Sequence, residues 1–359
     1  MDEIRRGGNP MPFHLKMKLI DRSCGFESKD PVVCCTPLSG NSTSVTSDPV
    51  VTVTTSSTKG VTLNPPDDAN IKIRFGLPNV ENHPNLRLLP TKKCGIFEDD
   101  RIVGGNVTEL FEMPWMVLLV YDSPEGRKLS CGGTLINEWY VLTAAHCVSF
   151  LDERLSLQGV LLGEHDVRED PDCDRVEQFC APNVRNVTVE KVIAHKGYNP
   201  ETRIDDIALL RLSDPADFNM ERMSPICLPF TSELQTVDLV AYLGIVAGWG
   251  ATEDGLQSPV LLKVYLPIVE NKECQEAYYG NFRIYDRQLC AGGVQGKDSC
   301  VGDSGGPLLI FPGTTSYNYQ YFQMGIVSYG SMQCGLKGQP GVYTRLAYYM
   351  DWILDNMHE

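Results

Sequence analysis

Short apolar runs separated by glycine and proline dominate the chain beyond residue 102. Three of these runs, Trp115–Val120, Gly159–Leu162 and Val260–Val264, predict β-strands. Because turn residues recur so often between such runs, barrels are favoured over an α/β sheet. Close to the C-terminus, apolar residues recur at helical spacing and predict a terminal helix that packs on the domain through Leu346, Tyr349, Met350, Trp352, Ile353 and Met357.

The pattern changes in residues 36–93, where apolar side chains are sparse and Ser, Thr and Pro recur. Such a composition cannot offset the entropy lost on ordering, so we expect a disordered linker. Val and Thr alternate in part of this segment, and a β-rich edge element is therefore the alternative.

Length and charge limit the class of protein. With 359 residues, 42% of them hydrophobic, the chain has room for one large globular domain with appendages. Its net charge of −15 argues against a nucleic acid or an anionic membrane as the main partner. No run of 18 apolar residues occurs, which argues against a membrane span.

The thirteen cysteines lack metal-site spacing, so they favour disulfides and a secreted, extracellular protein. Asn41, Asn106 and Asn186 each begin a glycosylation sequon, which agrees with secretion. The N-terminal segment Met1–Arg6 conflicts with this interpretation. No apolar segment follows it, so it does not form a signal peptide.

The stretch Asp298–Pro307 contains the sequence Gly-Asp-Ser-Gly-Gly. Its glycines permit a tight exposed turn, in which the backbone N–H groups of Gly302 and Ser304 can stabilise an oxyanion. Ser304 is therefore the candidate nucleophile of an acyl-transfer reaction. A plain surface loop is the alternative.

Two further motifs favour the catalytic interpretation. Thr143–Cys147 contains His146, and Asp206–Leu210 begins with a carboxylate before an apolar run. The order His, Asp, Ser along the chain is that of the chymotrypsin triad. On these motifs, residues 102–359 resemble the chymotrypsin-like (S1) serine proteases. The resemblance implies an all-β domain of two six-stranded antiparallel barrels followed by a C-terminal helix.

The resemblance also implies a role for each residue of the triad. It selects Asp206 as the triad aspartate, and we expect the preceding Asp205 to be a solvated neighbour. His146 would accept the proton of Ser304, because a serine hydroxyl alone is a weak nucleophile. Ser328 matches the family serine that supports the aspartate, and an ordinary strand residue is the alternative.

Substrate preference follows from the same resemblance. Asp298 matches the base of the primary specificity pocket, and Gly330 and Gly341 match its walls. A carboxylate in such a slot favours a substrate with Arg or Lys before the scissile bond.

The segment Asp99–Gly105 resembles the activation site of a trypsin-like zymogen, and residues 94–101 would end the activation peptide. Cleavage between Arg101 and Ile102 would convert a neutral amide into an ammonium group. That ammonium can pair with Asp303, a carboxylate whose burial is costly without a partner. The alternative is a turn with two glycines.

Ten cysteines have implied partners in the family. The resemblance implies four disulfides, Cys94–Cys227, Cys131–Cys147, Cys274–Cys290 and Cys300–Cys334. The remaining two of the ten, Cys173 and Cys180, would pair with each other and close a short loop. Three cysteines of residues 1–35 remain, Cys24, Cys34 and Cys35, and they resemble the end of a clip domain. Because that domain has six cysteines, we expect the true N-terminus, with a signal peptide, to be missing.

The acidic loop at residues 164–173 is the metal candidate, because hard oxygen ligands suit Ca²⁺. Clip-domain proteases often resemble calcium binders here. The expected ligands are Glu164, Asp166, Glu169 and Asp172. A solvated acidic loop is the alternative.

Taken together, the chain resembles the clip-domain proteases of arthropod haemolymph, of the Easter and Grass type. The resemblance implies a secreted protease zymogen of Toll signalling or of melanisation through prophenoloxidase activation. Its implied partners are an upstream trypsin-like activating protease, a downstream zymogen or cytokine precursor, and a serpin. A digestive trypsin and a non-catalytic clip-domain adaptor are the alternatives.

Overall fold

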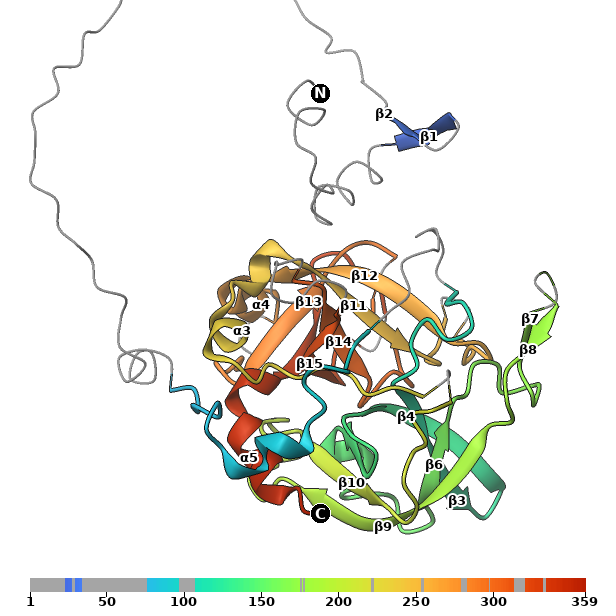
Figure 1. Cartoon of the computed structure of the whole chain (residues 1–359). Helices are drawn as coiled ribbons and strands as arrows, with labels where there is room; N and C mark the ends of the chain where they lie inside the picture. Colours follow the sequence, from blue (N-terminus) through green and yellow to red (C-terminus); the bar gives the residue numbers. More distant parts are fainter. Residues whose placement is uncertain are drawn as a thin grey trace, which may run out of the picture. The chain divides into compact units, whose positions relative to one another are not determined.

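The computed structural model describes residues 23–27, 30–33, 76–96, 107–174, 176, 178–220, 223–252, 255–278, 283–296, 298–312, 320–331 and 334–359. The chain divides into two units, Met1–Ile71 and Lys72–Glu359. In the first unit, β1 (Ser23–Glu27) and β2 (Asp30–Val33) pair as an antiparallel hairpin (Figure 1). The remainder of the expected clip remnant, with Cys34 and Cys35, lies outside the described residues.

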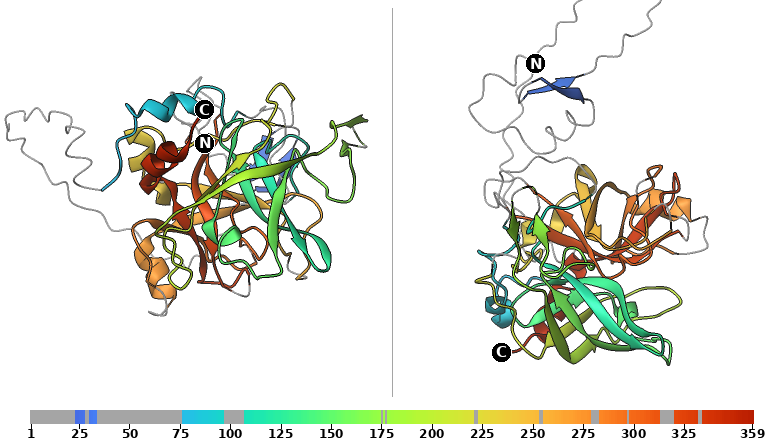
Figure 2. Two further views of the ribbon diagram at one scale, coloured as in Figure 1. Left: turned by 90° about the horizontal axis from the view of Figure 1, so that it is seen from below. Right: turned by 90° about the vertical axis from the view of Figure 1, so that its right-hand side faces the viewer.

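Six antiparallel strands close the first barrel in the order β10-β5-β4-β3-β6-β9. They are β3 (Met116–Ser123), β4 (Gly126–Leu135), β5 (Tyr140–Thr143), β6 (Ser156–Leu162), β9 (Arg185–Ala194) and β10 (Ala208–Leu212). The strands predicted near residues 115 and 159 are β3 and β6, and both predictions are confirmed. A small hairpin of β7 (Cys173–Asp174) and β8 (Phe179–Cys180) projects from this barrel (Figures 1 and 2).

The second barrel closes in the order β11-β12-β13-β16-β15-β14. Its strands are β11 (Leu243–Gly248), β12 (Leu262–Val269), β13 (Gln288–Gly292), β14 (Pro307–Ile310), β15 (Phe322–Tyr329) and β16 (Pro340–Arg345). The run predicted from Val260 corresponds to β12, which begins at Leu262. The predicted fold class, two six-stranded antiparallel barrels, is therefore confirmed.

In the described part of the chain, the helices are short and lie between or after the strands. They are the 3-10 helices η1 (Pro84–Leu88), η2 (Ala145–Cys147), η3 (Leu239–Ala241) and η4 (Leu346–Tyr348), and the α-helices α3 (Ser232–Thr236), α4 (Asn271–Ala277) and α5 (Met350–Asn356). Met350, Ile353 and Leu354 of α5 are fully buried and belong to the same apolar cluster as the core of the first barrel. The C-terminal stripe is thus a packing face, as predicted.

The prediction of a disordered linker over residues 36–93 was wrong for its last part. Residues 36–75 lie outside the described residues, but 76–93 pack against the protease domain, beside α5 (Figures 1 and 2). Leu77, Val80 and Leu89 bury their side chains there. Burial of each such side chain contributes about 1.5–3 kcal/mol, and the low average hydrophobicity of the segment concealed this contribution.

Asn85 adds polar contacts to this docking. Its side-chain Nδ2 donates to the carbonyl oxygens of Leu354 (2.9 Å) and Met357 (3.2 Å), at the C-terminal end of α5. Terminal helix carbonyls lack partners within the helix. Residues 76–93 therefore supply hydrogen-bond donors to the C-terminal end of α5, the last helix of the protease domain.

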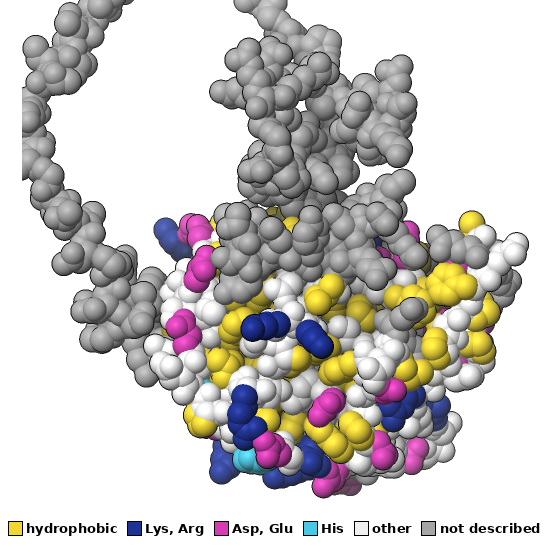
Figure 3. All heavy atoms as spheres, viewed as in Figure 1, with side chains coloured by type: hydrophobic (Ala, Val, Ile, Leu, Met, Phe, Trp, Pro, Cys, Tyr) yellow, Lys and Arg dark blue, Asp and Glu magenta, His cyan; other side chains and the backbone are white. Residues whose placement is uncertain are grey.

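All five predicted disulfides are present, Cys94–Cys227, Cys131–Cys147, Cys173–Cys180, Cys274–Cys290 and Cys300–Cys334. Of the sequon residues, Asn186 is exposed on β9, whereas Asn41 and Asn106 lie outside the described residues. Within the part of the chain that the structure describes, helices are too short to cross a bilayer. On the face shown in Figure 3, acidic and basic side chains are interspersed rather than gathered by sign.

Candidate active site

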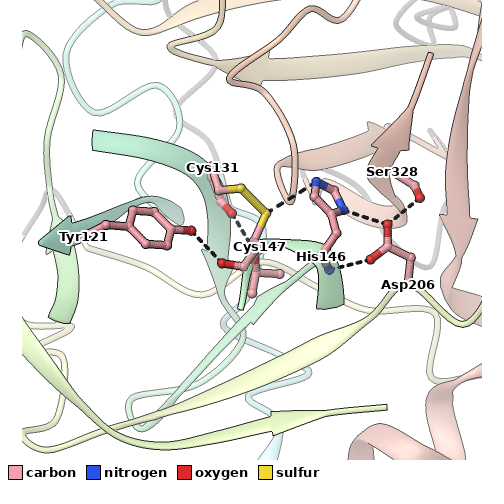
Figure 4. Close-up of a disulfide and its surroundings, with 8 residues drawn as sticks. Tyr121, Cys131, His146, Cys147, Asp206 and Ser328 are labelled. Atoms are coloured by element: carbon pink, nitrogen blue, oxygen red, sulfur yellow. Dashed lines mark hydrogen bonds and ion pairs between the residues drawn. A yellow bond between two sulfur atoms is a disulfide. The ribbon is translucent and has the colours of Figure 1, made fainter. Parts of the chain in front are cut away.

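The side chains of His146 and Asp206, both carried by the first barrel, are joined by a hydrogen bond (Figure 4). The imidazole Nδ1 lies 2.8 Å from Oδ2 of Asp206, and the backbone N–H of His146 donates to Oδ1 at 2.9 Å. Because a carboxylate only accepts, Nδ1 carries the ring proton and Nε2 is left with its lone pair. The imidazole is thereby oriented as a general base.

Asp206 is fully buried and is held from the second barrel. The Ser328 hydroxyl of β15 donates to Oδ2 at 2.5 Å, so Ser328 supports the triad aspartate. The Thr344 hydroxyl of β16 donates to the Asp206 carbonyl oxygen at 2.7 Å. The sequence analysis missed Thr344, because no local motif marks a threonine that lies 138 residues from its partner.

The expectation that Asp205 is solvated was wrong. Its side chain is buried and its carboxylate is bonded to Tyr349 and Arg287. The error has a physical reason, because both partners come from distant parts of the chain and only the fold brings them to this position.

The turn that carries Ser304 lies against the segment that carries His146. The Ser304 carbonyl oxygen accepts from the N–H of Gly132 at 2.7 Å. Gly305 has a φ of +79°, and a Cβ there would lie 2.3 Å from Thr143 Oγ1 and 3.2 Å from Cys147 Sγ. Only glycine permits both this backbone conformation and this close approach.

Among the described residues, no hydrogen bond joins Ser304 to His146. Nε2 of His146 faces Cys147 Sγ at 3.7 Å (Figure 4). Catalytic hydrogen bonds often tighten only when substrate binds. His146, Cys147 and Cys131 also place potential metal-ligand atoms together, but the two cysteines are joined in a disulfide and cannot act as thiolate ligands.

Asp298 lies half-buried and is held by backbone hydrogen bonds. Its carboxylate accepts from the backbone N–H groups of Ser299 (2.9 Å) and Gly335 (3.1 Å). Burial raises the pKa of Asp298 to about 6, and these two hydrogen bonds act in the opposite direction. Gly330 and Gly341 approach so closely that a Cβ on Gly330 would lie 3.7 Å from the Cα of Gly341. A Cβ on Gly341 would lie 3.3 Å from Ser299 Oγ, so the two glycines lie next to each other and Gly341 lies next to the residue that follows Asp298.

The Asp303 side chain lies in a cradle of backbone beside Gly248 and Gly250. Its two carboxylate oxygens accept from the N–H groups of Gly250 and Cys300, each at 2.8 Å. Burial raises the pKa of Asp303, which means that the charged form is disfavoured. Among the described residues, no lysine, arginine or histidine pairs with it. The proposed partner Ile102 and the cleavage residue Arg101 lie outside the described residues.

Of the four predicted calcium ligands, the structure brings two together. Glu164 and Asp172 are buried and both accept from the backbone N–H of His165, at 3.0 and 3.1 Å. Burial, followed by repulsion from Asp172, raises the pKa of Glu164 to about 7. A cavity of about 20 Å³ opens beside both carboxylates, which is room for one water-sized species.

The other two predicted ligands are turned elsewhere. Asp166 forms a two-point ion pair with Arg168, and Glu169 is exposed. Within the described residues, the carboxylates of this loop do not converge as a group of three. The donor chemistry of Glu164 and Asp172 nevertheless suits a hard cation.

The trypsin family model matches residues 102–353 of this chain. That range contains both barrels and the bonded His146–Asp206 pair, together with Ser304 on the adjoining turn. The chain therefore belongs to the trypsin family and is a serine endopeptidase of the S1 type.

Within this family the chain is similar to clip-domain serine proteases. "CLIP domain-containing serine protease HP8" of Bombyx mori is 40% identical over 363 residues, which cover 99% of this chain and 88% of that protein. "Melanization protease 1" of Drosophila melanogaster is 41% identical, covering 80% of this chain and 77% of that protein. The crystal structure of the Drosophila Grass clip serine protease of the Toll pathway matches with a TM-score of 0.65 and 32% identity, covering 99% of this chain and 90% of the other.

Proposed function

We propose that this chain is the secreted zymogen of an endopeptidase that cleaves after Arg or Lys and acts in an insect immune protease cascade. The observation that carries the cleavage preference is Asp298, a half-buried carboxylate whose neighbour Ser299 lies next to Gly341, with Gly330 beside that glycine. Among the described residues, no cation pairs with Asp298. A guanidinium or ammonium of the substrate is the group that would offset its desolvation.

Asp303 supports the zymogen part of the proposal. Its carboxylate has two backbone donors but no cationic partner among the described residues, so an ammonium from cleavage after Arg101 would supply the missing charge. Asp303 immediately precedes Ser304. Pairing at this point would therefore order the N–H groups of Gly302 and Ser304 that form the oxyanion hole.

The cascade role is drawn from the relatives. "Melanization protease 1" and the Grass protease of the Toll pathway associate this protein type with melanisation or Toll signalling. The corresponding partners are an upstream trypsin-like activator, a downstream zymogen or cytokine precursor, and a serpin. Five disulfides favour an extracellular location such as haemolymph.

The test compares intact protein with protein cut after Arg101. We expect only the cut form to hydrolyse arginyl and lysyl amides and to react rapidly with a fluorophosphonate. An Arg101→Gln variant exposed to the same activating protease is the matched control and should stay inactive. Cut protein without amidase turnover would contradict the proposal, and absence of phosphonate labelling would favour the adaptor alternative.

We also propose that Glu164 and Asp172 hold Ca²⁺, which would neutralise two neighbouring buried carboxylates. The melting temperature should then be higher in the presence of calcium than in the presence of a chelator, and Asp172→Asn should remove this difference. Asp152→Asn is the control, because Asp152 is exposed and, among the described residues, its ion pair is with nearby Arg154. An equal calcium response in both variants would refute the site.

A further inference from the structure

Asp205, one residue before the triad aspartate, is held in an unusual backbone conformation. It has a φ of +56° and is only 7% exposed. Its carbonyl oxygen accepts from the N–H of Ile207 at 2.9 Å, which closes a tight turn around Asp206. A non-glycine residue stays in the left-handed region when its surroundings hold it there. The contacts of the Asp205 side chain supply that restraint.

Three separate elements meet at the Asp205 carboxylate. The Tyr349 hydroxyl, at the start of α5, donates to Oδ1 at 2.7 Å. Arg287, which directly precedes β13 of the second barrel, places Nη1 2.7 Å from the same oxygen. His195, which follows β9 of the first barrel, places Nδ1 3.7 Å from Oδ2. One buried carboxylate therefore joins both barrels and the C-terminal helix.

The surroundings leave little freedom for this carboxylate to move. The ring of His195 contacts Tyr349 edge-on at 5.6 Å between centroids and Trp352 at 5.2 Å. At Gly197 a Cβ would lie 2.5 Å from Oδ2 of Asp205, so the backbone of Gly197 lies close beside the carboxylate and leaves no room for a side chain there. Asp205 is thus fixed by packing as well as by charge.

The position of this junction matters for the reaction. His146 and Asp206 come from the first barrel, whereas Ser304 comes from the second. Proton transfer requires that the two barrels stay in register at this point. Ser328 and Thr344 already tie Asp206 to the second barrel through its carboxylate and its carbonyl oxygen.

We propose that Asp205 is a positioning residue of the triad: its bonds to Arg287 and Tyr349 hold Asp206, and through it the His146 ring, in place against Ser304. A misplacement of about 1 Å at a reacting centre can cost about a hundredfold in rate. Asp205 does not touch the reacting atoms, so its removal should lower turnover without changing the substrate pocket.

The experiment uses full-length, cleaved enzyme and the variants Asp205→Asn and Asp205→Ala. We expect kcat per titrated active site to fall about tenfold to a hundredfold, with KM within about twofold of the parent. Asparagine should be the milder change, because its side-chain oxygen still accepts from the Tyr349 hydroxyl. The rate of fluorophosphonate inactivation should fall in parallel, and this readout does not depend on a preference for Arg or Lys.

Two further variants locate the effect. Tyr349→Phe removes one hydroxyl and Arg287→Gln removes the charge, and each should give a smaller decrease in kcat than Asp205→Ala. The double variant Asp205→Asn, Arg287→Gln should be no slower than Asp205→Asn alone, because the two residues act through one contact. If the Asp205 variants do not fold, Tyr349→Phe decides the question by itself.

Glu190→Gln is the matched control. It removes an ion pair with Arg211 that joins β9 and β10 of the same barrel but touches no triad residue, so kcat should not change. The proposal is overturned if Asp205→Asn keeps the parent kcat per active site. It is equally overturned if the loss of activity reflects only fewer titratable sites, since Asp205 would then serve stability alone.

Discussion

Acidification should weaken the proposed preference of the enzyme for cationic substrates. Asp298 is the reason, because burial raises the pKa of its carboxyl group to about 6. A raised carboxyl pKa means that the group takes up a proton as the pH falls through that value. The protonated carboxyl group then offers no charge to an arginine or lysine side chain.

The expected magnitude follows from this single titration. A carboxyl group of pKa about 6 is about nine-tenths ionised at pH 7, half ionised at pH 6 and about one-tenth ionised at pH 5. Since kcat/KM reports the free enzyme, recognition of a cationic side chain should weaken about tenfold between pH 7 and pH 5.

Two matched substrates separate Asp298 from the triad. One carries arginine before the scissile bond and the other carries citrulline, a neutral side chain of nearly the same shape. Any loss of activity in the triad itself slows both substrates equally, so the arginine-to-citrulline ratio of kcat/KM isolates the contribution of Asp298. We expect the ratio to fall about tenfold from pH 7 to pH 5 and to be flat in an Asp298→Asn variant.

A ratio in the parent enzyme that stays constant from pH 7.5 to pH 5 would refute this reasoning. It would mean that Asp298 remains ionised despite its burial, or that another group recognises the substrate cation.

Three other outcomes are expected. After activation, Cys94–Cys227 should keep both fragments together on a non-reducing gel, and two separate fragments would contradict that bridge. Asn85→Ala should lower the unfolding free energy by about 1–3 kcal/mol in urea titrations, because the carbonyl oxygens of Leu354 and Met357 at the end of α5 lose a side-chain donor; Asn79→Ala, which breaks a local contact to the backbone of Glu81, is the control. The acidic residues 98–100 directly precede the proposed cleavage site, and acidic flanks disfavour many trypsins; their replacement with alanine should therefore speed activation by unrelated trypsins, and unchanged rates would contradict this.

Local chemistry could be predicted from the sequence because it resides in short, contiguous motifs. The glycine-flanked Ser304 requires a tight turn, and His146 and Asp206 each lie beside an apolar strand that positions them. Strand periodicity and recurring turn residues were enough to indicate barrels. The family resemblance supplied the pairing of cysteines, which spacing alone leaves undetermined.

Contacts between distant residues could not be predicted in this way. Thr344 reaches Asp206 across 138 residues, and its polar side chain resembles that of any strand residue; the contact of Ser328 across 122 residues was expected only from the family resemblance. For the same reason Asp205 was taken for a solvated residue. The docking of residues 76–93 was hidden by an average hydrophobicity that is low even though three of their side chains are buried.

The sequence by itself therefore determined which groups are available for catalysis and which segments form strands, because both depend on neighbours along the chain. Only the tertiary structure decided which charges are buried and what holds them. Burial and pairing depend on residues from both barrels and the terminal helix, and closure of the two barrels brings these residues together.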